Sequence, residues 1–141
     1  MFSVQAQRDV AITSIASFFR SDESGVVQVY TKPGGYANFT ENATAWTLIY
    51  NNTILQNGKD SLTDVGSFID NQTVVIAKGE IQSFYVYSPN NLAYRKEDGV
   101  LEGDFVLGDN SLNFYAGIAI AYGQFGEGQI FSPRQFSGVL R

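Results

Sequence analysis

The chain has 141 residues and a net charge of −5, with only 16% charged residues against 44% hydrophobic ones. That length fits one domain, and low charge with 14% aromatic residues indicates a buried core rather than disorder. The 9 Lys and Arg residues are scattered, which argues against nucleic acid or an anionic membrane as a partner. No apolar run approaches the ~20 residues that span a bilayer, so we expect no membrane insertion.

Two residue types that carry much of enzyme chemistry are absent, because the chain contains neither Cys nor His. Their absence removes thiol nucleophiles, the Ser-His-Asp triad, and the Cys and His ligands of transition metals. The sequence therefore predicts a protein that is not an enzyme and that needs no cofactor, calcium aside.

The first half of the chain reads as short strands separated by polar loops. Residues 2–6 alternate apolar and polar side chains, which is typical of a half-buried strand. The apolar run 10–19 changes phase at Ile15, and its Thr and Ser residues favour strand over helix. Further strands are predicted at 26–31 and 46–50, with a tight turn at 51–52 into a strand at 53–55. Residues 36–45 and 56–67 are predicted loops.

The second half continues in the same way. The predicted strands lie at residues 73–77, 81–87, 92–95, 99–107, 112–122 and 136–141, and the Gly-rich segment 123–128 is a predicted loop. Nine or ten short strands without an amphipathic helix predict an all-β fold. We expect a single domain over residues 1–141, built as an antiparallel two-sheet β-sandwich of the jelly-roll type.

Four Asn-x-Thr tripeptides begin at Asn38, Asn42, Asn51 and Asn71, more than random placement would give. Each is an acceptor for N-linked glycan in a eukaryotic secretory pathway. The cluster predicts an extracellular or cell-surface glycoprotein. The alternative is coincidence, because β proteins place Asn at turns and Thr in strands. Residues 1–4 lack a signal-peptide pattern and both ends look strand-like, so we expect a mature or excised module of a longer protein.

Three stretches together resemble a known kind of domain: residues 27–36 with 45–49, residues 75–86, and residues 131–141. In this order they are similar to an uncharacterised β-rich domain, often in tandem copies, of predicted secreted proteins of diatoms, other stramenopiles and some bacteria. The matching residues are mostly strand and turn residues. The resemblance implies secretion and neighbouring copies, and it carries no catalytic or binding residues with it.

The densest acidic stretch offers the best candidate metal ligands, because calcium prefers several hard carboxylate oxygens. Its members are Glu97, Asp98, Glu102, Asp104 and Asp109. On a strand, Glu102 and Asp104 would share one face. The same pair could be read as the two carboxylates of a glycosidase, and the plainest alternative is that these charges are simply solvated.

Several Tyr residues are candidate sugar contacts, since aromatic faces pack against the apolar faces of sugar rings. The candidates are Tyr36, Tyr85, Tyr87 and Tyr94. The competing interpretation places Trp46 in the core and the Tyr hydroxyls at the rim of a sheet. Arg134 is expected to pair with a carboxylate beneath a loop.

These observations favour a non-catalytic extracellular structural or adhesive module that assembles with copies of itself or with neighbouring domains. The alternative is a carbohydrate-binding module, assisted by calcium. The region 97–141 carries no Asn-x-Thr tripeptide, so glycans would leave it free. We therefore expect the contact surface to lie there.

Overall fold

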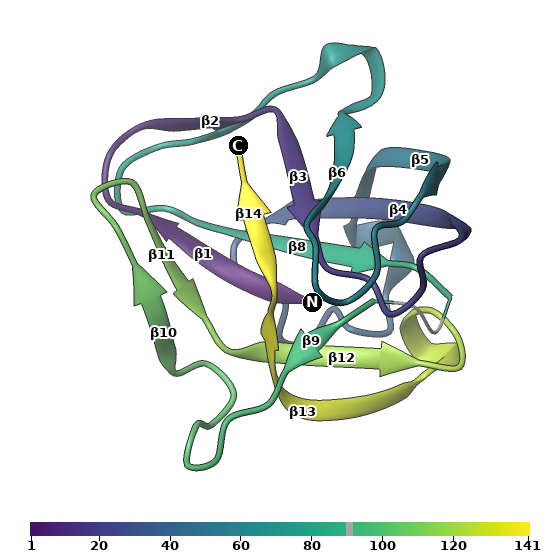
Figure 1. The fold of residues 1–141 in the computed structure, drawn as a ribbon. Coiled ribbons are helices and arrows are strands. Elements are labelled where there is room, and N and C mark those ends of the chain that lie inside the picture. The colour runs from purple at the N-terminus through teal and green to yellow at the C-terminus, as the bar shows by residue number, and fades with distance from the viewer. Residues whose placement is uncertain (90–91) are drawn as a thin grey trace.

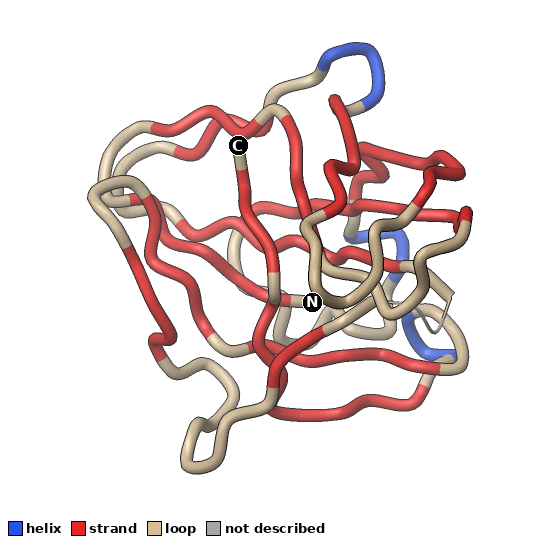
Figure 2. The backbone as a smooth tube through the Cα atoms, in the orientation of Figure 1, coloured by secondary structure: helices blue, strands red, loops and turns tan. Residues whose placement is uncertain are grey.

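A computed structural model describes residues 1–89 and 92–141 (Figure 1). The fold is all-β, with several antiparallel sheets, as expected. Helical structure in the described ranges is limited to three short 3₁₀ turns (Figure 2): η1 (Ala43–Ala45), η2 (Ile69–Asn71) and η3 (Phe125–Glu127). Within those ranges, no helix has the length and apolar character needed to cross a membrane.

The largest sheet has six strands in the order β10-β11-β1-β8-β4-β5, and all neighbours are antiparallel. Its strands are β1 (Phe2–Ala6), β4 (Ser24–Pro33), β5 (Thr47–Leu55), β8 (Ile81–Tyr87), β10 (Phe105–Gly108) and β11 (Leu112–Tyr115). Strand β1 lies in the middle and pairs with β8 on one side and β11 on the other. The sheet therefore ends in two edge strands, β10 and β5.

Three smaller sheets complete the fold. They have the orders β12-β13-β9, β14-β3-β6 and β2-β7. Their strands are β2 (Val10–Ile12), β3 (Ser14–Ser17), β6 (Thr63–Ser67), β7 (Val74–Ile76), β9 (Tyr94–Arg95), β12 (Gly117–Ala121), β13 (Gln129–Phe136) and β14 (Gly138–Leu140). In Figure 1, β14, β3 and β6 cross in front of the long strands of the main sheet.

The main sheet carries a buried core on each of its faces. Successive residues of β8 point to opposite faces, so Phe84 joins one cluster and Tyr85 the other. The larger cluster packs the sheet against the layer that holds Ile15 and Phe68. The smaller cluster is aromatic, and Trp46 packs there as an interior residue.

Two predicted breaks in the first half of the chain are wrong. Residues 51–52 do not turn, because β5 pairs with β4 from Leu55 to Tyr50 and, after a shift of register, from Leu48 to Thr47, which places Asn51 opposite Gln28. The predicted loop 56–67 contains β6, which pairs with β3. In both places, partners distant in sequence outweigh the local preference of Asn, Gly and Asp for turns.

Several predicted strands are divided or shortened. The run 10–19 forms two strands with different partners: β2 pairs with β7, whereas β3 pairs with β6 and β14. This change of partners explains the phase change at Ile15. The run 112–122 divides into β11 and β12. The strand predicted at 99–107 is reduced to β10, because Gly99 and Gly103 have φ values of 84° and 87° in turns. Residues 129–136 form β13 ahead of the short closing strand β14.

Candidate functional site

All four Asn side chains of the Asn-x-Thr tripeptides are exposed. Asn38, Asn42 and Asn71 lie in or beside turns, and Asn51 lies on the edge strand β5. The Thr44 hydroxyl donates a hydrogen bond to the Asn42 side-chain oxygen at 2.7 Å. Each acceptor is therefore open to solvent in the folded chain. Glycans at Asn51 would stand over one edge of the main sheet and leave the other edge uncovered.

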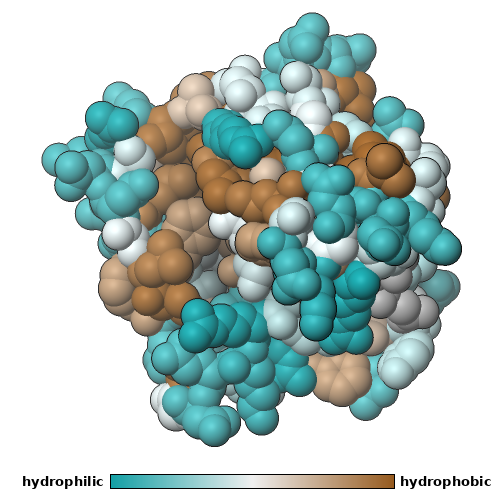
Figure 3. All heavy atoms as spheres, in the orientation of Figure 1, coloured by the Kyte–Doolittle hydropathy of each residue, from teal (hydrophilic) through white to brown (hydrophobic). Residues whose placement is uncertain are grey.

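The uncovered edge, β10, exposes large apolar side chains. Phe105 is 58% exposed and Leu107 is 57% exposed, and Leu101, in the preceding turn, is also exposed. Beside them, a groove of about 230 Å³ opens between the β10–β11 pair and β13–β14. Its apolar lining includes Phe114 and Leu140. Figure 3 shows hydrophobic residues gathered around a hollow in this part of the surface. The exposed side chains of β10 and the adjoining groove both lie within 97–141, and together they are called the β10 surface from here on.

Two of the four predicted sugar-contact residues lie in the interior. Tyr36 is 6% exposed and Tyr85 is 2% exposed, and both belong to the aromatic cluster on the second face of the main sheet. The Tyr85 ring meets Phe125 and Trp46 edge-on. These two Tyr rings are therefore not available for stacking on a sugar, contrary to the sequence-based expectation. Tyr87 is half-buried against the same cluster.

The two buried Tyr hydroxyls differ in their hydrogen bonding. The Tyr36 hydroxyl donates to Glu102 Oε1 at 2.8 Å. Burial, followed by this hydrogen bond, raises the pKa of the Tyr36 hydroxyl well above its usual value. The Tyr85 hydroxyl makes no hydrogen bond of normal geometry among the described residues. Burial also raises the pKa of Tyr85.

This difference predicts opposite effects of the same chemical change. Tyr85→Phe removes a buried hydroxyl whose backbone contact at Phe125 falls short of normal hydrogen-bond geometry, and it should stabilise the protein by up to about 1 kcal/mol. Tyr36→Phe removes a hydrogen bond to a carboxylate, and it should cost about 1.5 kcal/mol. Urea unfolding of both variants measures these changes in the free energy of unfolding. Destabilisation of equal size in both variants would contradict the assignment.

The acidic residues do not assemble into the predicted calcium site. In the described ranges, no three acidic side chains gather in a way that could hold a metal ion. Glu102 and Asp104 lie in a turn rather than on one strand face, and Glu102 accepts hydrogen bonds from Tyr36 and Ser132.

Two of the remaining carboxylates fix turns. Asp104 accepts a hydrogen bond from the Leu101 amide at 2.8 Å, and hydrogen bonds from the Leu112 and Ser111 amides lower the pKa of Asp109. Glu97 and Asp98 are exposed. Calcium assistance stays a prediction that a calcium titration would test.

Two cations lie close to the ring of Tyr94, the fourth predicted sugar contact. The Arg20 guanidinium carbon lies 5.6 Å from the centroid of its ring, and that of Arg134 lies 5.4 Å away. Arg134 also lies 5.6 Å from the Phe131 ring centroid. Arg134 was expected to pair with a carboxylate. Its Nη1 donates instead to the Pro133 carbonyl at 2.7 Å.

A hollow of about 140 Å³ adjoins this arrangement. It is lined by Arg20, Tyr94, Phe131 and the side chain of Tyr122, which is 76% exposed. Sequence reasoning missed Arg20, Tyr122 and Phe131, because they are distant in sequence and isolated in composition. The pairing of β9 with β13 and of β12 with β13, together with the bridge between Phe19 and Leu92, brings these segments together.

No protein-family model, curated protein or solved structure matches this chain. The resemblance to the β-rich domain of diatom and stramenopile secreted proteins therefore stays a prediction.

Proposed function

We propose that this chain is a non-catalytic structural or adhesive module that joins a second copy, or a neighbouring module, through the β10 surface. The observation that carries the proposal is the contrast between the two edges of the main sheet. Strand β5 bears the Asn51 glycan acceptor and exposes Leu55 at its end, whereas β10 bears no acceptor and exposes Phe105 and Leu107.

Edge strands present unpaired backbone groups that can pair with another chain. Monomeric proteins commonly protect such edges with charged side chains, proline or short strand length. Strand β10 is short, but its exposed side chains are apolar and its flank opens into a groove lined by core residues. A partner strand on β10 would satisfy the backbone groups and cover the apolar side chains.

The charges around β10 bear on how two copies would meet. Glu102, Asp104 and Asp109 are exposed near this strand, and like charges placed opposite one another are unfavourable. Two β10 edges facing each other would bring these carboxylates together. We therefore propose that β10 of one copy meets a different face of the next, a head-to-tail contact that repeats into chains or filaments.

The proposal also covers the cellular location of the protein, its glycosylation and the topology of the sandwich. We propose an extracellular or cell-surface location, glycosylation at the four exposed Asn residues, and a jelly-roll form of the sandwich. The exposure of every acceptor Asn supports the first two proposals. The packing of a smaller layer across the main sheet supports the third.

Sedimentation velocity across a concentration series tests the assembly. The unmodified chain should associate as its concentration rises, and Leu107→Lys should weaken that association at least about tenfold, because it charges an apolar contact. Val75→Lys is the matched control, since Val75 is 72% exposed on β7, away from β10. Material from a eukaryotic secretory host should lose mass on glycosidase treatment and should associate before and after that treatment.

A chain that stays monomeric at high concentration would contradict the assembly, as would loss of association in Val75→Lys with none in Leu107→Lys. The proposed extracellular location would be contradicted if the secreted material carried no glycan at Asn38, Asn42, Asn51 and Asn71. These two failures are separate, because one concerns β10 and the other concerns the glycan acceptors.

Carbohydrate binding is the second candidate function. Burial of Tyr36 and Tyr85 removes the platform predicted from the sequence, so this candidate now depends on the hollow beside Tyr94 and on the exposed ring of Tyr122.

A further inference from the structure

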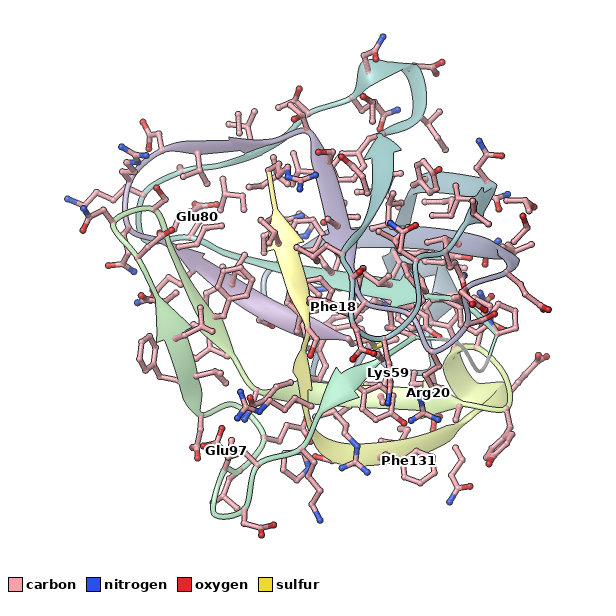
Figure 4. The ribbon with its side chains drawn as sticks, in the orientation of Figure 1. Phe18, Arg20, Lys59, Glu80, Glu97 and Phe131 are labelled. Carbon is pink, nitrogen blue, oxygen red and sulfur yellow. The ribbon has the colours of Figure 1, made fainter. Side chains whose placement is uncertain are left out.

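We infer that the hollow beside Tyr94 is the second face of the head-to-tail contact and receives the exposed side chains of β10 from the next copy of the chain. The inference rests on the proposed assembly and names the surface that β10 meets. Figure 4 draws Arg20 and Phe131, which line the hollow, at the right of the view, and Figure 1 draws β10 at the left. Each copy can therefore present both surfaces at once, which a repeating contact requires.

The hollow has the size and lining for single apolar side chains. Its volume of about 140 Å³ is below the ~300–1,000 Å³ of pockets that enclose a drug-sized ligand. Ile120 and the rings of Tyr94 and Phe131 are among its lining residues. Phe105 and Leu107 are exposed on β10. An exposed apolar patch that fits a hollow elsewhere on the same molecule joins copies head to tail.

Tyr122 lies at the side of the hollow with an exposed ring and a strained backbone. Its side chain is 76% exposed, and its φ is 63°, which is rare for a bulky residue. Such strain in non-glycine residues is concentrated at sites that clamp a ligand or act as switches. Tyr is also enriched among the residues that contribute most to binding at protein interfaces. We therefore expect the Tyr122 ring to pack against the side chains that enter the hollow.

The charges of the two surfaces are opposite. Among the described residues that line the hollow, Arg20 is the charged one, and the neighbouring Asp22 and Glu23 do not line it. On the other surface, Asp109 is the charged residue of the groove, and Asp104 directly precedes β10. The ion pair found within 4 Å in residues 1–89 and 92–141 involves none of these residues. Opposite charges favour this contact over one between two β10 edges, where carboxylates would face each other.

Sedimentation velocity on variants of the hollow tests the inference. Tyr122→Asn removes the ring but keeps a residue that tolerates a positive φ, and it should weaken association at least about tenfold. Arg20→Glu should also weaken association. Added salt should weaken association of the unmodified chain more than that of Arg20→Glu, because salt screens the attraction between opposite charges.

Val75→Asn is the matched control for Tyr122→Asn. Val75 is 72% exposed, and it lines neither the hollow nor the groove beside β10. The control therefore replaces an equally exposed apolar side chain with the same residue, and association should not change.

A mixture of two deficient variants tests the pairing of the surfaces directly. Leu107→Lys leaves the hollow intact, and Tyr122→Asn leaves β10 intact. The mixture should form one-to-one pairs that grow no further, because each pair uses the one contact that still works. If two β10 edges met each other instead, Tyr122→Asn would associate with itself, and the mixture would form no new pairs.

The inference is overturned if Leu107→Lys weakens association while Tyr122→Asn and Arg20→Glu leave it unchanged. That result keeps the proposed assembly through β10 and leaves the hollow to the second candidate function. Equal losses in Val75→Asn and Tyr122→Asn, or a mixture without one-to-one pairs, would also overturn it. A chain that does not associate at all overturns both the inference and the proposed assembly.

Discussion

Phe84→Ala is expected to destabilise the protein by about 4 kcal/mol, within the range measured for removal of a buried Phe side chain. Phe84 is fully buried in the centre of the main sheet, where its ring centroid lies 5.8 Å from that of Phe2. Phe2 in turn stacks on Phe136 of β13 at 4.2 Å. Loss of the Phe84 ring leaves a cavity where β8, β1 and β13 meet, and denaturant unfolding measures the change in free energy.

The matched control is Phe105→Ala, which truncates the same residue type in the same sheet. Phe105 lies at the edge on β10, and its ring meets only Tyr115 edge-on among the described aromatic pairs. Its truncation should cost less than about 1 kcal/mol. A loss of similar size in both variants would contradict the position of the core.

Gly117→Ala is expected to cost about 3 kcal/mol, because the added carbon has no space. A Cβ at Gly117 would lie 2.0 Å from the backbone oxygen of Met1, so the backbone must move. That movement disturbs two hydrogen bonds between β12 and the start of the chain: Met1 N donates to Ile118 O at 2.7 Å, and Ile118 N donates to Met1 O at 2.9 Å. Thermal and urea unfolding measure the loss.

Gly35→Ala provides the comparison for Gly117→Ala. No atom lies within 4 Å of a Cβ built at Gly35, and its φ is not in the left-handed region. Gly35→Ala should therefore change the free energy of unfolding by less than about 0.5 kcal/mol. If Gly117→Ala were equally harmless, β12 would not pack against Met1 as described.

The sequence predicted the class of the fold because strand patterns are local. Alternation in residues 2–6 and the β-branched run at 26–31 correspond to β1 and part of β4. The errors fall where a partner distant in sequence decides the outcome. Asn51 lies inside β5 because Gln28 pairs with it, and the Gly-, Asp- and Ser-rich loop 56–67 contains a strand because β3 pairs with it.

The candidate sites were less accessible to sequence reasoning than the fold. The absence of Asn-x-Thr tripeptides from 97–141 predicts a contact surface in the same region that holds the β10 surface. For the other candidate residues, the direction of each side chain in the fold determines whether it is buried or exposed. Tyr85 and Tyr87 share one sheet face by period, but nothing in the sequence shows that Trp46 and Phe125 cover it. Likewise, Arg20 and Arg134 each lie near the Tyr94 ring only because segments far apart in the chain pack together.

Two-dimensional amide NMR over a dilution series tests the proposed assembly most directly, since it reports on both sheet edges at once. As the concentration rises, the amide signals of β10, residues 105–108, should shift or broaden. The amide signals of β5 should stay unchanged, except at any residue that forms the second face of the head-to-tail contact. Leu107→Lys should remove the β10 changes. Signals that do not depend on concentration, or changes centred on β5 with β10 unaffected, would contradict assembly through the β10 surface.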